Sequence, residues 1–271
     1  MKLSELTARL RTVDADSAEL EARLLFKRCA QVSDAEIILG DPSADSAALD
    51  DALARRLSGE PLAYILGDTE FFRESYLVTP DVLIPRPDTE CLVEYAVEHL
   101  PRGARFADLC TGSGCIAIST LAARPDTTAI AVDVSDAALA VARRNAERNG
   151  VSDRISFLRA DVLAGIDSAV LGRLDAALSN PPYIAHAVTE TLSREVRHEP
   201  MLALDGGEDG LDFYRAMLSY LPALVQSGMI LLEIGYDQES AVTRLAQEVG
   251  LCCRVRRDYG GNPRVAILEK P

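Results

Sequence analysis

The feature that most constrains the fold is an alternation of strand-like and helix-like sequence from about residue 105 to the C-terminus. Short apolar runs rich in β-branched residues alternate with longer stretches whose apolar residues recur at helical spacing. This rhythm predicts an α/β fold, a mostly parallel sheet covered by helices on both faces. We expect strands at 105–109, 128–133, 155–159, 174–179, 228–234, 252–258 and 264–269. We expect helices at 88–100, 115–123, 135–149, 210–225 and 238–249.

Other patterns complete the predicted organisation of the chain. Residues 1–60 have apolar residues at helical spacing and Asp or Ser at plausible helix starts, which predicts a small N-terminal all-helical domain. Residues 61–86 contain short aromatic and β-branched runs, which predict a β-hairpin linker. The α/β domain then occupies 87–271. Its last two strands are joined only by Gly-Gly-Asn-Pro, so we expect an antiparallel edge hairpin.

The charge of the chain argues against a nucleic-acid partner. It has 42 acidic and 28 basic residues and a net charge of −14. Residues 1–85 carry half of the excess negative charge and residues 86–271 carry the other half, so neither part of the chain has an excess of basic residues. Affinity for nucleic acid comes mainly from Lys and Arg on phosphates, and we therefore expect no direct contact with nucleic acid.

The expected cellular compartment is inferred from the absence of a signal peptide, of a membrane-spanning run and of metal-binding cysteine patterns in the sequence. The N-terminal residues lack the apolar core of a signal peptide, and no apolar run is long enough to span a bilayer. The cysteines form no Cys-x-x-Cys pair and no zinc-ligand spacing with histidine. We expect a cytoplasmic protein with no membrane partner, no metal site and buried thiols. The cysteines are Cys29, Cys91, Cys110, Cys115, Cys252 and Cys253.

A glycine loop follows the predicted strand at 105–109. Its sequence is Cys110-Thr111-Gly112-Ser113-Gly114, and it opens the helix at 115–123. Ligands of open α/β sheets bind at such strand ends. The loop lacks the third glycine of a dinucleotide fingerprint and the lysine of a P-loop. Asp133, which ends the next strand, could accept both ribose hydroxyls, and Asp161 could accept an adenine amino group. The pattern favours an adenosine-containing ligand; the alternatives are an ordinary strand-to-helix turn and, for Asp161, a helix N-cap.

The most specific local signal is Asn180-Pro181-Pro182-Tyr183, directly after the strand at 174–179. Two successive prolines fix φ and keep Asn180 out of the helical region. The Asn180 side-chain oxygen and the Pro181 carbonyl could then accept hydrogen bonds from a planar NH₂ group, and Tyr183 could supply an aromatic wall. The alternative is a purely structural Pro-Pro turn.

Together these motifs resemble the class I S-adenosylmethionine-dependent methyltransferases. The Asn-Pro-Pro-Tyr segment is similar to that of enzymes that methylate planar nitrogen. Nearly the whole chain resembles the HemK/PrmC family of peptide chain release factor N5-glutamine methyltransferases. The stretches that carry this resemblance are 64–67, 70–72, 83–90, 108–114, 179–183, 199–211 and 257–265.

The resemblance implies methyl transfer from S-adenosylmethionine to the glutamine of the Gly-Gly-Gln motif in peptide chain release factors, by an enzyme that we expect to be a monomer. The implied cofactor-binding residues are Cys110, Thr111, Gly112, Ser113, Gly114, Asp133, Asp161, Val162 and Asn180. The implied catalytic residues are Asn180, Pro181 and Tyr183, and the implied substrate-binding residues are Asn180, Pro181, Pro182, Tyr183 and Arg86. Phe71 or Phe72 and segment 84–90 would line the pocket. The alternatives are an N6-adenine methyltransferase acting on DNA or another nucleic acid, and a protein-binding scaffold.

Three positions depart from the family pattern. Asp88 stands where Glu is common, Cys110 where Gly is common, and Val162 where some relatives have an aromatic residue. We expect Cys110 to be tolerated provided that its φ stays negative, and Val162 to remove a stacking surface without removing the pocket.

Overall fold

The computed structural model describes residues 1–225 and 227–271. The chain divides into two compact units. The first contains Met1–Asp68 together with Ser193–His198, and the second contains Thr69–Leu192 and Glu199–Pro271.

The first unit is helical, as predicted. Its helices are α1 (Leu3–Leu10), α2 (Ala18–Ala30), α3 (Asp34–Leu39), α4 (Ala47–Leu57) and α5 (Leu62–Leu66). Ser33 and Ser46 cap α3 and α4, because each side-chain oxygen accepts a backbone N–H of the first turn. The apolar faces meet in one core that includes Leu6, Leu25 and Phe26.

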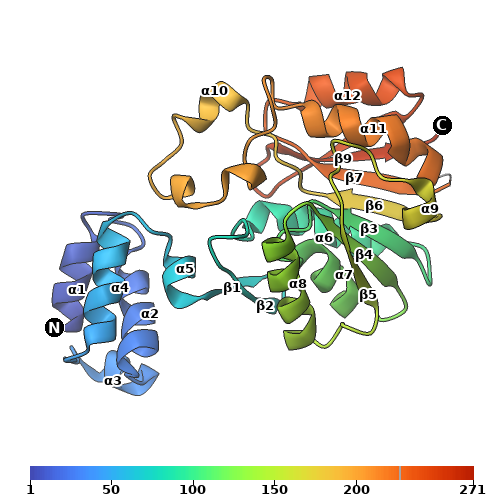
Figure 1. Ribbon diagram of the computed structural model, residues 1–271. Coiled ribbons are helices and arrows are strands. Elements are labelled where there is room, and N and C mark those ends of the chain that lie inside the picture. Colours follow the sequence, from blue (N-terminus) through green and yellow to red (C-terminus); the bar gives the residue numbers. More distant parts are fainter. Residues whose placement is uncertain (226) are drawn as a thin grey trace. The chain divides into compact units, whose positions relative to one another are not determined.

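The second unit contains a seven-stranded sheet with the order β5-β4-β3-β6-β7-β9-β8 (Figure 1). The strands are β3 (Arg105–Leu109), β4 (Thr128–Asp133), β5 (Ile155–Arg159), β6 (Ala176–Ser179), β7 (Met229–Glu233), β8 (Cys252–Arg257) and β9 (Pro263–Glu269). β3 to β7 pair in parallel, whereas β9 is antiparallel to both β7 and β8. The mostly parallel sheet and its antiparallel edge hairpin are confirmed.

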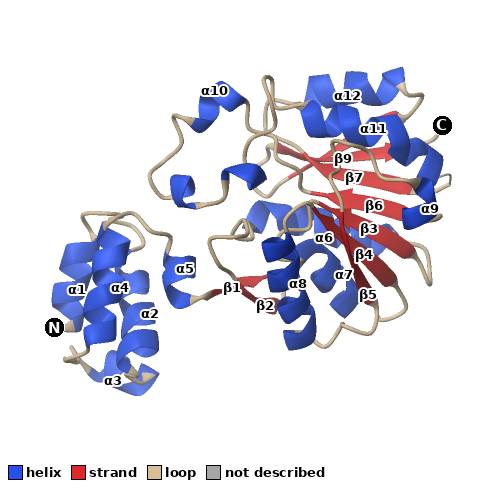
Figure 2. Cartoon of the chain, viewed as in Figure 1, coloured by secondary structure: helices blue, strands red, loops and turns tan. Residues whose placement is uncertain are grey.

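Helices cover both faces of this sheet (Figure 2). The helices that cover the sheet are α6 (Glu90–His99), α7 (Cys115–Ala123), α8 (Asp136–Arg148), α11 (Asp212–Leu224) and α12 (Glu239–Glu248). The second unit also contains the short helices α9 (Ser168–Leu171) and α10 (His186–Thr189), and α10 lies away from the sheet. Short 3₁₀ turns are η1 (Pro87–Thr89), η2 (Val196–His198) and η3 (Met201–Ala203). Successive strand residues point to opposite faces. Phe106 therefore joins the core that includes α6 and α7, and Ala107 joins the core that includes α11 and α12.

The register of the parallel strands places the sequence motifs at one edge. Leu109, the last residue of β3, lies opposite Val132 of β4 and Ser179 of β6. The residues that follow them, Cys110, Asp133 and Asn180, therefore leave the same edge of the sheet. Ser179 Oγ also donates to the Leu109 carbonyl at 2.6 Å, which ties β6 to β3 at this point.

The stretch predicted as a hairpin linker is hairpin only in part. The strands are β1 (Asp68–Phe71) and β2 (Glu74–Leu77), but Leu62–Leu66 form α5. This short helix turns Leu62, Ile65 and Leu66 toward the core of the first unit and ends at Gly67, whose φ is +81°. The aromatic and β-branched residues of this stretch suggested a strand. It forms a helix instead, because its apolar residues are buried against the helices of the first unit. The short helices α9 and α10 were not predicted.

The prediction of buried thiols holds for only some cysteines. Cys91 and Cys115 are buried, Cys29, Cys110 and Cys253 are half-buried, and Cys252 is exposed. Cys252 begins β8, which is an edge strand of the sheet, so part of its surface faces water.

Candidate active site

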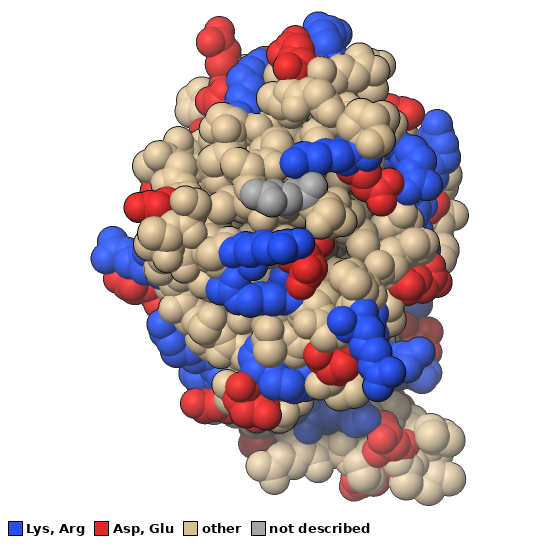
Figure 3. Space-filling view, turned by 90° about the vertical axis from the view of Figure 1, so that its right-hand side faces the viewer, with Lys and Arg blue, Asp and Glu red and all other residues tan. Residues whose placement is uncertain are grey.

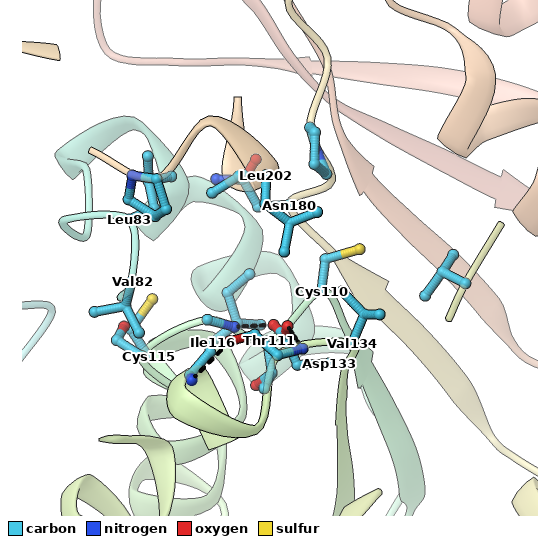
Figure 4. A pocket seen from close by; sticks show the side chains of 18 of the residues that line it. Val82, Leu83, Cys110, Thr111, Cys115, Ile116, Asp133, Val134, Asn180 and Leu202 are labelled. Atoms are coloured by element: carbon cyan, nitrogen blue, oxygen red, sulfur yellow. Dashed lines mark hydrogen bonds between the residues drawn. The ribbon is translucent and has the colours of Figure 1, made fainter. Parts of the chain in front are cut away.

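A cavity opens where β3, β4 and β6 end, and the motifs predicted from sequence meet there (Figure 4). In that view Asn180 and Leu202 lie on one side of the cavity, and Thr111 and Asp133 lie on the other. Of the predicted cofactor and substrate residues, those lining the cavity are Arg86, Cys110, Thr111, Gly112, Ser113, Asp133, Asp161, Val162, Asn180 and Pro182. Gly114, Pro181 and Tyr183 lie outside this lining.

The glycine loop is shaped by its backbone hydrogen bonds. Thr111 N donates to the Val132 carbonyl at 3.0 Å, and Gly114 N donates to the Thr111 carbonyl at 2.8 Å. Gly114 has a φ of +82°, and a Cβ there would lie 2.8 Å from Ile118 Cδ1. Glycine is therefore required where the loop enters α7. Gly112 also has a positive φ, but open space surrounds its Cβ position. A ligand can therefore approach the backbone closely at Gly112.

Asp133 connects this loop to the end of β4. Its Oδ2 accepts a hydrogen bond from Gly112 N at 2.9 Å, and its Oδ1 accepts one from Ser135 N at 2.9 Å. Burial raises the pKa of Asp133, and these hydrogen bonds oppose that shift. Each oxygen keeps a further lone pair, so both can accept ribose hydroxyls.

Asp161 and Val162 form the next part of the cavity rim. Asp161 is exposed, and its Oδ1 accepts a hydrogen bond from Leu163 N at 2.8 Å. The carboxylate thus closes a tight turn at the end of β5 rather than starting a regular helix. Val162 beside it is only 3% exposed.

Cys110 does not meet the condition set for it, a negative φ, since its φ is +58°. The chain must turn sharply as it leaves β3 to form the loop, and the left-handed conformation provides that turn. For a residue with a Cβ this conformation costs roughly 1–2 kcal/mol. This chain therefore has a strained backbone at the cavity wall.

Asp108 is a residue that the site predictions missed. It is completely buried in β3, and its Oδ2 accepts hydrogen bonds from Thr111 Oγ1 at 2.6 Å and Ala117 N at 3.2 Å. Burial raises its pKa to about 7, although both hydrogen bonds lower it. A single carboxylate within a buried apolar strand was the available signal. Its side chain holds the glycine loop against α7.

The Asn-Pro-Pro-Tyr turn leaves β6 with its Asn180 side chain at the cavity. Asn180 Nδ2 donates to Thr89 Oγ1 at 3.2 Å, so the amide oxygen Oδ1 is the end left to accept a hydrogen bond. Pro181 and Pro182 are buried. Tyr183 packs against the core around α11, and burial raises its pKa to about 12.

A glycine-rich loop supports this turn from behind. Gln238 Nε2 donates to the Tyr183 carbonyl at 3.0 Å and to the Gly210 carbonyl at 3.1 Å. A Cβ on Gly206 would lie 2.8 Å from the Pro182 carbonyl oxygen, and one on Gly210 would lie 2.4 Å from the Tyr183 carbonyl oxygen. Only glycine permits this backbone-to-backbone approach.

Arg86 lies at the cavity but is not a free cation. It pairs with Glu199, whose side chain is 1% exposed and also accepts a hydrogen bond from Ile84 N at 3.0 Å. Neither Phe71 nor Phe72 lines the cavity, which corrects the expectation drawn from the family. Phe71 is buried in the core around α6 and α7.

Comparisons with known proteins agree with this geometry. Residues 88–206 match the family described as Methyltransferase small domain, and residues 2–67 match the PrmC N-terminal domain. The chain is 39% identical to the release factor glutamine methyltransferase of Nitratidesulfovibrio vulgaris, over 97% of this chain and 92% of that protein. It is 40% identical to the release factor glutamine methyltransferase of Moorella thermoacetica, over 99% of this chain and 97% of that protein. The chain belongs to the release factor glutamine methyltransferase family.

A solved structure supports the fold of this family member. A methyltransferase from Pyrococcus furiosus is similar with a TM-score of 0.56 and 18% identity, covering 81% of this chain and 98% of that one. Within the described residues 1–225 and 227–271, no helix is long and apolar enough to cross a membrane. In the same residues, His, Cys, Asp and Glu form no group of three or more that could hold a metal ion.

The residues of this methyltransferase fit a bound S-adenosylmethionine. The Asp133 oxygens can accept ribose hydroxyls, and the open space at Gly112 permits close approach to the backbone. Asp161 and Val162 line the same cavity beyond the end of the neighbouring strand β5.

Proposed function

We propose that this protein transfers the methyl group of S-adenosylmethionine to the side-chain amide nitrogen of the glutamine in the Gly-Gly-Gln motif of peptide chain release factors. The observation that carries this proposal is the orientation of Asn180. Its Nδ2 is occupied by Thr89, which leaves Oδ1 as an acceptor beside the glycine loop. Family membership favours a protein glutamine over the alternative substrate, an adenine in nucleic acid.

When bound, S-adenosylmethionine supplies an electrophilic methyl group on its sulfonium. The residues that would hold it are Cys110, Thr111, Gly112, Ser113, Asp133, Asp161 and Val162. Gly114 acts indirectly, by letting the loop pack against α7.

The contribution of the Asn-Pro-Pro-Tyr turn is electrostatic and geometric. The nitrogen of a glutamine amide is a weak nucleophile because its lone pair is delocalised into the carbonyl. Asn180 Oδ1 and the Pro181 carbonyl accept hydrogen bonds from the two N–H groups and hold the nitrogen in line with the methyl group. Those hydrogen bonds strengthen as positive charge grows on the nitrogen. The proton can leave after methyl transfer, so the mechanism does not need a strong base. Among the described residues, the histidines lie outside the cavity lining.

The substrate is tested by incubating the protein with labelled S-adenosylmethionine and either purified release factor or duplex DNA. Mass spectrometry then locates the methyl group. We expect the label on the glutamine of the Gly-Gly-Gln peptide. Label on adenine, with the release factor unmodified, would support the alternative function.

The role of Asn180 is tested by Asn180→Ala. We expect kcat to fall about 10²-fold or more, the scale of removing a preorganised hydrogen-bonding group from an oxyanion hole. The dissociation constant for S-adenosylmethionine should change little in isothermal titration calorimetry. Turnover near that of the wild type would refute the assignment.

The release factor would be met by a single copy of this chain in the cytoplasm. This part of the proposal is supported by a cavity whose walls all come from one unit of one chain. Light scattering during turnover measures the mass of the active species, and the mass of a dimer would contradict the proposal that a single copy is active.

A further inference from the structure

Segment 199–206 supplies part of the cavity wall. Its lining residues are Pro200, Leu202 and Ala203, and segment 82–89 supplies a second group, which consists of Val82, Leu83, Pro85, Arg86 and Thr89. In Figure 4, Leu83 and Leu202 lie on the same side of the cavity as Asn180. The cofactor would occupy the side of the glycine loop, so a substrate side chain would approach Asn180 between these two segments.

One end of segment 199–206 is fixed to the Asn-Pro-Pro-Tyr turn. Ile184 directly follows that turn, and its N–H donates to the Leu204 carbonyl at 3.0 Å. Gly206 N donates to the Ile184 carbonyl at 2.8 Å. These hydrogen bonds form an isolated parallel β-bridge between Ile184 and Asp205. The backbone around residue 205 is therefore held in place relative to the turn that carries Asn180.

The other end of segment 199–206 is held by the side chain of Glu199. Its carboxylate accepts a hydrogen bond from Ile84 N at 3.0 Å and pairs with the Arg86 guanidinium. Both partners belong to segment 82–89, so this contact joins the two segments. The Glu199 side chain is 1% exposed. A carboxylate that is so deeply buried is tolerated only while such partners stay beside it, which makes the contact strict about position.

Glu199 also limits what Arg86 can bind. Arg86 lines the cavity and its side chain is 39% exposed, so a free guanidinium there would attract a carboxylate. The pairing with Glu199 neutralises that charge. The other lining residues of the two segments are apolar, with the exception of Thr89. An uncharged amide can enter between them, whereas a carboxylate would lose its water without gaining a cation.

We propose that Glu199 positions segments 82–89 and 199–206 against each other and, by neutralising Arg86, makes the opening between them select an uncharged side chain. The inference rests on the proposed function, since it concerns how the substrate glutamine is chosen. It assigns Arg86 an indirect role: the guanidinium holds Glu199 in place instead of binding the substrate.

The positioning role is tested in the full-length protein with Glu199→Gln and Arg86→Gln. We expect each to lower kcat/KM for the release factor about tenfold, the scale of one hydrogen bond to a charged group, with the affinity for S-adenosylmethionine within about twofold of the wild type. Arg86→Lys keeps the charge and should recover most of kcat/KM. The double variant should lose less than the product of the two single losses, because both single changes break the same contact. Wild-type kcat/KM in Glu199→Gln would overturn the proposal.

The selection of an uncharged side chain is tested by binding alone. The probes are a release factor and its variant with glutamate in place of the glutamine of the Gly-Gly-Gln motif. The wild-type enzyme should bind the glutamate variant about tenfold more weakly, and Glu199→Gln should remove that difference because Arg86 can then pair with the glutamate. Calorimetry measures both affinities. If Glu199→Gln discriminates as the wild type does, the selection is not due to Glu199.

A matched control is Asp126→Asn. Asp126 has the same kinds of partner as Glu199, since it accepts a hydrogen bond from Gly103 N at 2.8 Å and pairs with Arg124. It lies just before β4 begins and outside the cavity lining. Loss of its charge should leave kcat/KM and the discrimination between the two release factors unchanged. An equal loss in Asp126→Asn would show a general effect on stability and would contradict the proposed role of Glu199.

A further readout does not depend on the substrate. Leu204 N and Asp205 N both donate to the Met201 carbonyl at 3.0 Å, and these turns protect their amides from hydrogen exchange. Peptides from segment 199–206 should exchange faster in Glu199→Gln than in the wild type, and unchanged exchange would refute the positioning role. If the wild type methylates no glutamine but the variant shows this faster exchange, the proposed function fails and the positioning role stands.

Discussion

Cys110 has a left-handed backbone conformation, which is unfavourable for a residue with a side chain. Its φ of +58° is costly for any residue with a Cβ and most costly for a β-branched one. We expect Cys110→Gly to be neutral or to stabilise the protein by up to about 1 kcal/mol, and Cys110→Val to destabilise it by more than 1 kcal/mol. Urea denaturation of the three proteins measures the differences. A Val variant as stable as the wild type would show that the strain is absent.

Asp133 is expected to act on cofactor affinity and not on the methyl transfer step. Asp133→Ala removes the acceptor for Gly112 N and the proposed acceptor for both ribose hydroxyls, so the dissociation constant for S-adenosylmethionine should rise at least tenfold. Asp136→Ala is a matched control, because that carboxylate pairs with Arg159 at the surface. Calorimetry on both variants separates the roles, and equal affinities would refute the assignment of Asp133.

At the scale of single residues, the sequence predicted which residues lie at the strand ends, but it did not predict the side-chain contacts that those residues make. Asp133, Asp161 and Asn180 were predicted because each lies at or just after the end of a predicted strand. The contact between Asn180 and Thr89 was not predicted, because the two residues are 91 positions apart and the sequence around one gives no information about the other. Long-range pairs of this kind depend on tertiary packing, and local spacing carries no signal for them.

At the scale of elements, the loop around Gly206 and Gly210 shapes the Asn-Pro-Pro-Tyr turn. Gly206→Ala would place a Cβ 2.8 Å from both the Pro182 carbonyl oxygen and Tyr183 Cα, and neither backbone can move without shifting Asn180. We expect this substitution to lower kcat by at least tenfold and to destabilise the protein by about 1–3 kcal/mol. Gly40→Ala is a suitable control, because Gly40 likewise has no left-handed φ and the space around its Cβ position is open. A Gly206→Ala enzyme no worse than that control would contradict this account.

Buried strands and long amphipathic helices were predicted closely because their apolar pattern is sustained. β3, α7, β4 and β5 have the predicted bounds. Leu62–Leu66 was mistaken for strand because five residues are too few to show a helical period. The turns η1 and η3, which supply Thr89 and Leu202 to the cavity, also lacked a usable pattern.

At the scale of the whole molecule, the charge of −14 bears on the encounter with a basic partner. Figure 3 shows one face, on which Lys and Arg side chains are interspersed with Asp and Glu. A release factor loop that works within ribosomal RNA should have basic neighbours, and complementary charge would then accelerate association. We expect added salt to slow association with the release factor and to leave affinity for S-adenosylmethionine almost unchanged. If the association rate measured by stopped flow does not depend on salt, the negative charge does not assist association and contributes only to solubility.

The segment Ser193–His198 belongs to the first unit although its neighbours in sequence belong to the second. Arg194 packs at Gly59, and Glu195 lies 3.5 Å from the buried Arg56. The polypeptide therefore passes between the units three times, after residues 68, 192 and 198. A fragment that begins at Thr69 would carry this segment without its partners, and a single proteolytic cut would not free either unit. The helical unit is thus built from two separate stretches of the chain and not from the N-terminal stretch alone.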